Sequence, residues 1–208
     1  MIDAAIPPVD APTLTLDCPT YCMQIMANCT GTNAQYVDNA HCMAACATFD
    51  AQGSAVTDQT GNTLGCRLHF AAEALNQTLA TDDCAFAGPA GELVNANPAA
   101  HCSDGDVCNS FCTLEIASCG SLDQPLAGDP KGASGNSLYQ YVNQANCVQN
   151  CDTLNKNNLY SPTSKGDSYA CRLLQATNAA ISVIPNAKMF CSSTGVDPTD
   201  PCTGTASP

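Results

Sequence analysis

Cysteine is the residue type in this 208-residue chain with the most chemistry available to it, because its sulfur can close a disulfide or bind a metal ion. The sixteen cysteines fall into two sets of eight with nearly the same spacing. The first three members of the two sets lie 90 residues apart, the next three 105, and the seventh 107. This spacing indicates an internal duplication. The sets are Cys18, Cys22, Cys29, Cys42, Cys46, Cys66, Cys84 and Cys102, then Cys108, Cys112, Cys119, Cys147, Cys151, Cys171, Cys191 and Cys202.

The C-x3-C pairs predict disulfides between helices. Two cysteines four positions apart lie one turn apart on a helix face, so two antiparallel helices of this kind can be joined by two bonds. This geometry favours Cys18–Cys46, Cys22–Cys42, Cys108–Cys151 and Cys112–Cys147. The remaining cysteines would then pair as Cys29–Cys66, Cys84–Cys102, Cys119–Cys171 and Cys191–Cys202. Eight cysteines allow on the order of a hundred pairings, so the firmer prediction is that bonds close within each repeat.

Metal binding is the alternative use of these sulfurs. Facing C-x3-C helices could present thiolates to Cu(I), Zn(II) or an iron–sulfur cluster. The chain has no C-x2-C spacing of the common zinc type and no C-x-x-C-H motif for covalent haem. Disulfides are therefore the favoured interpretation.

The three histidines form a second candidate metal set. His41, His69 and His101 all lie in the first repeat, each beside or near a cysteine. If the helices pack as proposed, His41 and His69 face each other, and three imidazoles suit copper or zinc. The alternative is that they are surface or capping residues. No G-x-S-x-G motif accompanies them, and a bridged cysteine is not a nucleophile, so no catalytic residues are predicted.

The two arginines occupy the same place in both repeats. Arg67 and Arg172 each directly follow the sixth cysteine of their set. A planar guanidinium suits a carboxylate or several backbone carbonyls, which predicts a structural clamp on a loop, with ligand binding as the alternative.

Acidic residues near the junction of the repeats offer oxygen atoms to Ca²⁺. Asp104 and Asp106 form a D-x-D pattern, which is more often simply solvated charge. The further acids of this candidate set are Asp82, Asp83 and Glu92.

The composition predicts a chain that depends on its disulfides. Leu, Ile, Val and Phe supply only 35 of 208 residues, Trp is absent, and the net charge is −13. Such values alone would suggest disorder, but dense cysteine is typical of small disulfide-stapled proteins in oxidising compartments. We expect an extracellular, cell-surface or periplasmic location. The acidic charge argues against binding nucleic acid or anionic membranes, and no stretch is long and apolar enough to span a bilayer.

These cysteines and arginines need helices to position them. We predict a mostly α fold of two tandem disulfide-stapled three-helix units with irregular, cysteine-pinned tails. The predicted helices of the first repeat are 18–29, 38–49 and 62–79, and those of the second are 108–119, 143–154 and 167–184. The segments 80–103, 185–202 and 121–135 read as irregular chain. The predicted domains are a Pro/Asp/Ala tether at 1–17, repeat one at 18–105, repeat two at 106–202 and a tail at 203–208.

The N-terminal residues lack the features of a signal peptide, which needs a basic start and an apolar run. We interpret Met1 as an added start on a mature or truncated chain. The following tether, with Pro7, Pro8 and Pro12, is of the kind that follows a lipid or membrane anchor.

One run of the first repeat resembles a cysteine-rich module of unknown function found in extracytoplasmic proteins and lipoproteins of myxobacterial type. The resemblance is carried by Tyr21-Cys22, Cys29-Thr30-Gly31, Ala34-Gln35-Tyr36, Cys42, Cys46 and Gly61-Asn62-Thr63-Leu64-Gly65-Cys66-Arg67. It implies a secreted or lipoprotein-like context. Members often carry histidines around the seventh cysteine, where this chain has Asp83 and Phe86.

These observations together predict a secreted or surface-anchored, non-enzymatic binding or structural module whose partner is an extracellular protein or small ligand. The cleft between the repeats is the expected ligand site. The alternatives are a copper or zinc handling protein and a subunit of an extracellular assembly. No cofactor is expected unless copper, zinc or calcium binds.

Overall fold

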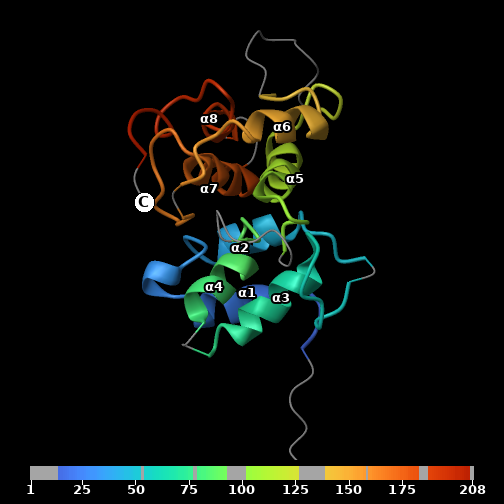
Figure 1. Ribbon diagram of the computed structural model, residues 1–208. Helices are drawn as coiled ribbons and strands as arrows, with labels where there is room; N and C mark the ends of the chain where they lie inside the picture. The colour runs from blue at the N-terminus through green and yellow to red at the C-terminus, as the bar shows by residue number, and fades with distance from the viewer. Residues whose placement is uncertain are drawn as a thin grey trace, which may run out of the picture.

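The fold is mostly α-helical, as the sequence predicts (Figure 1). The computed structural model describes residues 14–52, 54–76, 79–92, 102–126, 139–157, 159–182 and 187–206. An isolated bridge between extended segments joins Asp50 and Thr63. The helices are α1 (Cys18–Asn28), η1 (Gly31–Asn33), α2 (Asn39–Cys46), α3 (Leu64–Glu73), α4 (Ala80–Ala87), α5 (Val107–Cys119), α6 (Gln144–Cys151), α7 (Tyr169–Ala180) and α8 (Ala187–Cys191).

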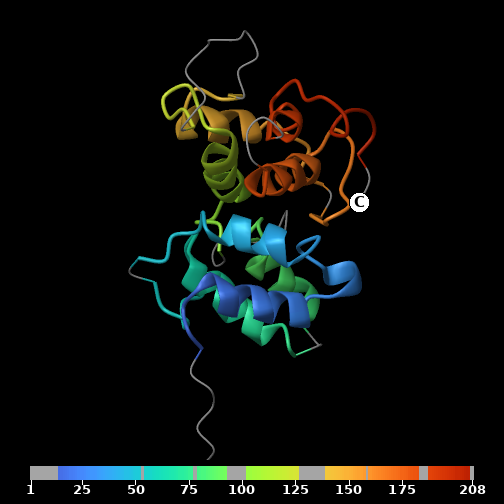
Figure 2. The ribbon, with the colours of Figure 1, turned by 180° about the vertical axis from the view of Figure 1, so that it is seen from behind.

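The helices gather into two groups. We call residues 14–105, with α1–α4, the first half and residues 106–206, with α5–α8, the second half. In each half the first helix packs against the three that follow, and the halves meet where α2 packs against α7. Figures 1 and 2 show α2 on the side of the first half that faces the second. None of the helices in the described part of the chain has the length and apolar composition needed to cross a bilayer.

The third helix of each half is shorter than predicted. We expected helices over 62–79 and 167–184, but α3 ends at Glu73 and α7 at Ala180. Both begin after a hydroxyl cap, since the side chains of Thr63 and Ser168 accept hydrogen bonds from backbone amides inside the first turn. Such a cap satisfies an amide that has no carbonyl partner within the helix.

Each half also has a fourth short helix, so the prediction of irregular chain over 80–103 and 185–202 is wrong in part. In α4, alanines and early acidic residues favour a helix, and the disruptive Gly88 and Pro89 come only after it. In α8 the helix begins after Pro185. The glycines and prolines that suggested irregular chain therefore mark helix ends.

All sixteen cysteines are paired, and every disulfide closes within its own half, as predicted. The four bonds expected from facing C-x3-C helices are confirmed: Cys18–Cys46, Cys22–Cys42, Cys108–Cys151 and Cys112–Cys147. The other four predicted pairs are wrong. The structure has Cys29–Cys84, Cys66–Cys102, Cys119–Cys191 and Cys171–Cys202.

The direction of α1 relative to α3 explains this correction. The side chain of Asn28, at the end of α1, donates at 2.8 Å to the carbonyl of Ala71, near the C-terminal end of α3. The end of α1 therefore lies beyond reach of Cys66, which sits in the first turn of α3. The unexpected helix α4 brings Cys84 to Cys29 instead, and Cys66 is left for the loop that carries Cys102.

One hydrophobic core runs through both halves. Tyr21 on α1 meets Tyr36 edge-on at 6.4 Å between ring centroids, and Phe111 on α5 meets Tyr141 in the same way at 6.4 Å. Phe111 stands 90 residues after Tyr21, and Tyr141 stands 105 residues after Tyr36, which are the offsets of the cysteine sets. The duplicated spacing of the sequence is thus matched by duplicated packing. Residues 1–13 of the expected tether lie outside the described ranges.

Candidate functional site

The second arginine is a buried clamp on a loop. The guanidinium of Arg172, on α7, donates through Nε to the carbonyl of Gly195 at 2.9 Å and through Nη1 to that of Ser168 at 3.1 Å. Its Nη2 lies 3.5 Å from the carbonyl of Val196 and 2.9 Å from a carboxylate oxygen of Asp167. The side chain thus joins the start of α7 to the loop after α8.

The first arginine makes the corresponding contacts. Arg67, on α3, donates through Nε to the carbonyl of Gly88 at 3.3 Å and through Nη1 to that of Thr63 at 3.4 Å. Its Nη2 donates to the hydroxyl of Ser110 on α5 at 3.1 Å, and its guanidinium carbon lies 4.0 Å from the ring centroid of Phe49. Burial lowers the pKa of Arg67, although an arginine stays charged in a protein. Both arginines therefore donate to backbone carbonyls inside the molecule, as a structural clamp would, and their role remains a prediction.

The glycines held by the clamps lie close to glutamine side chains. A Cβ on Gly88 would collide with the amide oxygen of Gln35, and a Cβ on Gly195 would collide with that of Gln140. Gln35 and Gln140 are 105 residues apart, like the two arginines. The same loop, glutamine and arginine are thus packed together twice in the chain.

Two of the three predicted histidines lie in the described part of the chain. His41 lies on α2, where its Nδ1 is 2.8 Å from a carboxylate oxygen of Asp38, and this contact lowers the pKa of Asp38. His69 lies on α3, with its ring edge-on to Phe70. His101 lies outside the described residues. The structure therefore places His41 in a helix-capping contact, and the three-histidine site remains a prediction.

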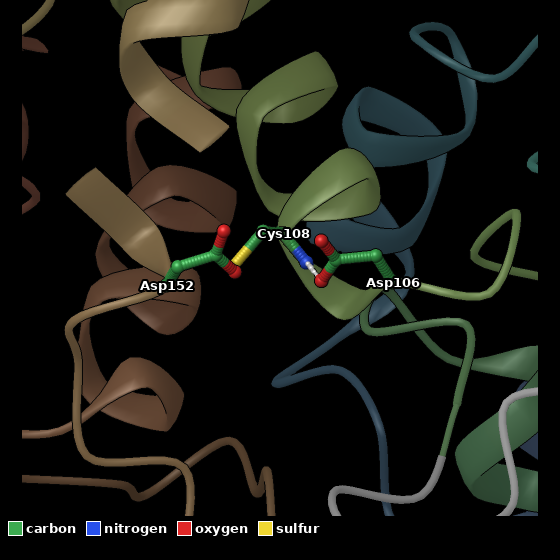
Figure 3. Close-up of side chains that lie close together, drawn as sticks. All are labelled: Asp106, Cys108 and Asp152. Carbon is green, nitrogen blue, oxygen red and sulfur yellow. Dashed lines mark hydrogen bonds between the residues drawn. The ribbon is translucent and has the colours of Figure 1, made fainter. Parts of the chain in front are cut away.

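The described residues contain one group of three possible metal ligands within 4.8 Å of one another, formed by Asp106, Cys108 and Asp152 (Figure 3). Its sulfur is committed to the disulfide with Cys151, so only two carboxylates remain as donors. Asp106 caps α5 by accepting from the amide of Cys108, and Asp152 pairs with Lys156 at 3.1 Å. Both carboxylates already have structural partners.

The other residues of the predicted calcium set are spread over several elements. Asp104 accepts from the amide of Asn62, and Glu92 is buried against the hydroxyl of Ser103. Asp82 and Asp83 lie in the first turn of α4, where burial and nearby carboxylates raise the pKa of Asp83. Calcium binding by this set also remains a prediction.

A buried carboxyl that sequence reasoning did not select lies in the second half. Glu115 on α5 is 0% exposed, and burial raises its pKa to about 8. One carboxyl oxygen lies 2.8 Å from the hydroxyl of Thr194, and the other has no hydrogen-bond partner. A signal was present in the sequence, because Glu115 falls on the same helical stripe as Cys108, Cys112 and Cys119. Because disulfide-bonded cysteines lie on the buried face of a helix, a glutamate on the same face is expected to be buried as well.

Comparison with known protein families, with curated proteins and with solved structures finds no match to this chain. Buried arginine and carboxyl groups contact loops from the helices in the sites described above.

Proposed function

We propose that this protein is a non-enzymatic, disulfide-stapled module that presents a rigid surface to a partner outside the cytoplasm. The observation that carries the proposal is the use of its reactive side chains. All sixteen cysteines are in disulfides, and Arg67 and Arg172 bind backbone carbonyls inside the molecule. Groups spent on internal contacts are not available to a substrate.

The disulfides support the compartment. Eight bonds in 208 residues are consistent with an oxidising environment such as the extracellular space or a periplasm. The reducing cytosol does not maintain such bonds. We infer that the protein is secreted or displayed at a surface, where a partner protein or a small ligand reaches it.

Rigidity supports a role in presentation. Each α-helix of the described part, α1 to α8, contains at least one disulfide-bonded cysteine, and one core joins the halves. A surface that is ordered before binding loses little conformational entropy when a partner arrives. The acidic charge of −13 favours a partner with basic groups.

A metal function through thiolates is opposed by the same bonds, because a bridged sulfur is not a thiolate. Membership of a larger extracellular assembly is compatible with a presented surface and is the second candidate.

Counting thiols in denatured, unreduced protein, beside a metal analysis of the native protein, tests the proposal. We expect no free thiol and no stoichiometric copper or zinc. Many free thiols with bound metal would replace the proposal by metal handling. A turnover screen against hydrolase and oxidoreductase substrates tests the non-enzymatic part, and activity abolished by a point substitution would refute it.

A further inference from the structure

The second half contains a buried polar pair where the first half is apolar. Glu115 stands 90 residues after Ile25, and Thr194 stands 107 residues after Ala87. Each of the four side chains is at most 1% exposed. The two positions are thus equally buried in the two halves, and only the second half has a carboxyl and a hydroxyl there.

The contacts of the Thr194 hydroxyl depend on whether Glu115 is protonated. Its Oγ1 lies 2.8 Å from Oε1 of Glu115 and 2.7 Å from the carbonyl oxygen of Cys191. A hydroxyl has one hydrogen, so it can donate to only one of these two acceptors. Both contacts are satisfied when the hydroxyl donates to Cys191 and a protonated Glu115 donates to the hydroxyl. If Glu115 ionises, the hydroxyl must turn to the carboxylate, and the contact with Cys191 is lost.

The surroundings of Glu115 favour the protonated state. Helices α6, α7 and α8 pack against α5. No ionisable side chain lies on α6, and Tyr141 precedes that helix. On α7, Arg172 binds its loop carbonyls and Asp167 rather than Glu115. The side chain of Lys188 on α8 lies outside the described part. No described lysine or arginine nitrogen forms an ion pair with Glu115. Burial is the larger effect on the pKa of Glu115 and the contact with Thr194 opposes it, so the pKa is raised to about 8.

The pair connects α5 to one loop, residues 192–196, which contains Thr194. The carbonyl of Thr194 accepts from the hydroxyl of Tyr141 at 2.9 Å, and Arg172 binds the carbonyls of the next two residues. The flanking disulfides, Cys119–Cys191 and Cys171–Cys202, fix both ends of the wider segment. A change at Thr194 can therefore loosen the middle of this segment while its ends stay in place.

We propose that Glu115 and Thr194 form a proton-dependent latch, in which the neutral carboxyl holds the loop 192–196 closed and loss of its proton to solvent opens the loop. Ionisation leaves a carboxylate in the core with an oxygen that has no donor, a cost that local opening to water relieves. The first half, with Ile25 and Ala87, has no such latch.

Nuclear magnetic resonance of protein labelled at the glutamate carboxyl carbons tests the latch. The Glu115 signal is assigned by its loss in Glu115→Gln. We expect it to titrate with a midpoint near 8, and the backbone amides of 192–196 to shift with the same midpoint. The amides of residues 85–89, the matching segment of the first half, should not follow it. A Glu115 midpoint in the ordinary range of glutamate would overturn the proposal.

Two variants separate the latch from a general effect of pH. In Glu115→Gln the side chain stays neutral at all pH values, so the shifts at 192–196 should disappear. Glu115→Ile combined with Thr194→Ala copies the first half and should behave in the same way, which covers the case that Glu115→Gln does not fold. Shifts that persist in either folded variant would show that another group opens the loop.

Discussion

In both halves the buried arginine donates to backbone carbonyls in the same way, but its side-chain partners differ between the halves. Each guanidinium holds the residue before its own helix and a glycine carbonyl in a distant loop. In the second half Nη2 of Arg172 also binds Asp167, and in the first half Asn62 occupies the equivalent position. There Arg67 binds Ser110, whose hydroxyl lies 3.4 Å from the amide oxygen of Asn62. The backbone contacts are common to both halves, whereas the side-chain partners have diverged.

This difference makes the first half depend on the second. Ser110 belongs to α5, so the buried arginine of the first half is completed across the boundary. Asp167, by contrast, lies in the same half as Arg172 and its side chain is 63% exposed. An exposed carboxylate contributes little to stability, since water and salt screen it. The two halves thus share buried polar contacts across their boundary, and we expect them to unfold together.

The largest expected effect comes from reducing the disulfides, which tests whether both halves depend on them equally. Each closed loop contributes about 2–4 kcal/mol by restricting the unfolded chain. With few large apolar residues, the remaining core should not hold either half together. We expect full reduction at neutral pH to abolish helical circular dichroism, whereas the oxidised protein resists heating and melts in one transition. Helicity that survives reduction with an unchanged melting temperature would contradict this.

Substituting the arginines tests whether the shared backbone contacts or the diverged partners matter more. Arg172→Met removes the donor of the carbonyls of Gly195 and Val196, at about 1–3 kcal/mol for each buried group. In Arg67→Met the carbonyls of Thr63 and Gly88 still accept from the backbone amides of Arg67 and Gly91. We expect Arg172→Met to lose about 3 kcal/mol of unfolding free energy in chemical denaturation, and Arg67→Met to lose less. Asp167→Asn, the matched control for the exposed partner, should change it by less than about 0.5 kcal/mol. A large loss in Asp167→Asn with a small loss in Arg172→Met would reverse the conclusion.

The sequence predicted those features that repeat at fixed spacing. The offsets of 90 and 105 residues predicted a duplication. The C-x3-C pairs predicted four disulfides that the structure confirms, because helix geometry places such sulfurs on one face. The position of Arg67 and Arg172 after equivalent cysteines predicted loop clamps, and each donates to a loop carbonyl.

The sequence did not predict features that depend on how helices cross. The relative direction of α1 and α3 decides that Cys29 meets Cys84, and no spacing in the chain encodes that direction. Glu115 was visible on a buried stripe, but its partner Thr194 lies 79 residues away in a loop. Long-range pairs between a helix and a loop are set by tertiary packing rather than by periodicity.

The polar pair of the second half gives the next prediction, a pH dependence that Ile25 and Ala87, at the equivalent positions of the first half, cannot produce. The folded pKa of Glu115, about 8, lies above its ordinary value of 4.5, so the folded state keeps the proton that the unfolded state releases. Stability from this group is therefore full below about pH 4.5 and falls by up to about 1.4 kcal/mol per pH unit as pH rises toward 8. Urea unfolding at several pH values should show this slope.

Glu115→Ile combined with Thr194→Ala serves as the control, because it gives the second half the apolar pair of the first. This variant should lose the slope attributed to Glu115 while other titrations remain. An identical slope in the variant and in the parent protein would assign the pH dependence to other groups.

The smallest expected effect concerns the contacts that cross between the halves. Asn62 donates to the hydroxyl of Thr113 at 3.3 Å and accepts from that of Ser110 at 3.4 Å, so it links the start of α3 to two residues of α5. Because neutral hydrogen bonds are worth about 0.5–1.5 kcal/mol each, Asn62→Ala and Ser110→Ala should each destabilise by about 1 kcal/mol. In a double-mutant cycle the two should couple by about 0.5 kcal/mol or more, since they share one network. Asn62→Asp should reproduce the residue of the second half and bring a carboxylate toward Arg67. Two results together would contradict a role for these polar contacts: an additive cycle, and unfolding of Asn62→Ala in one transition like that of the parent protein. The core between α2 and α7 would then hold the halves together without them.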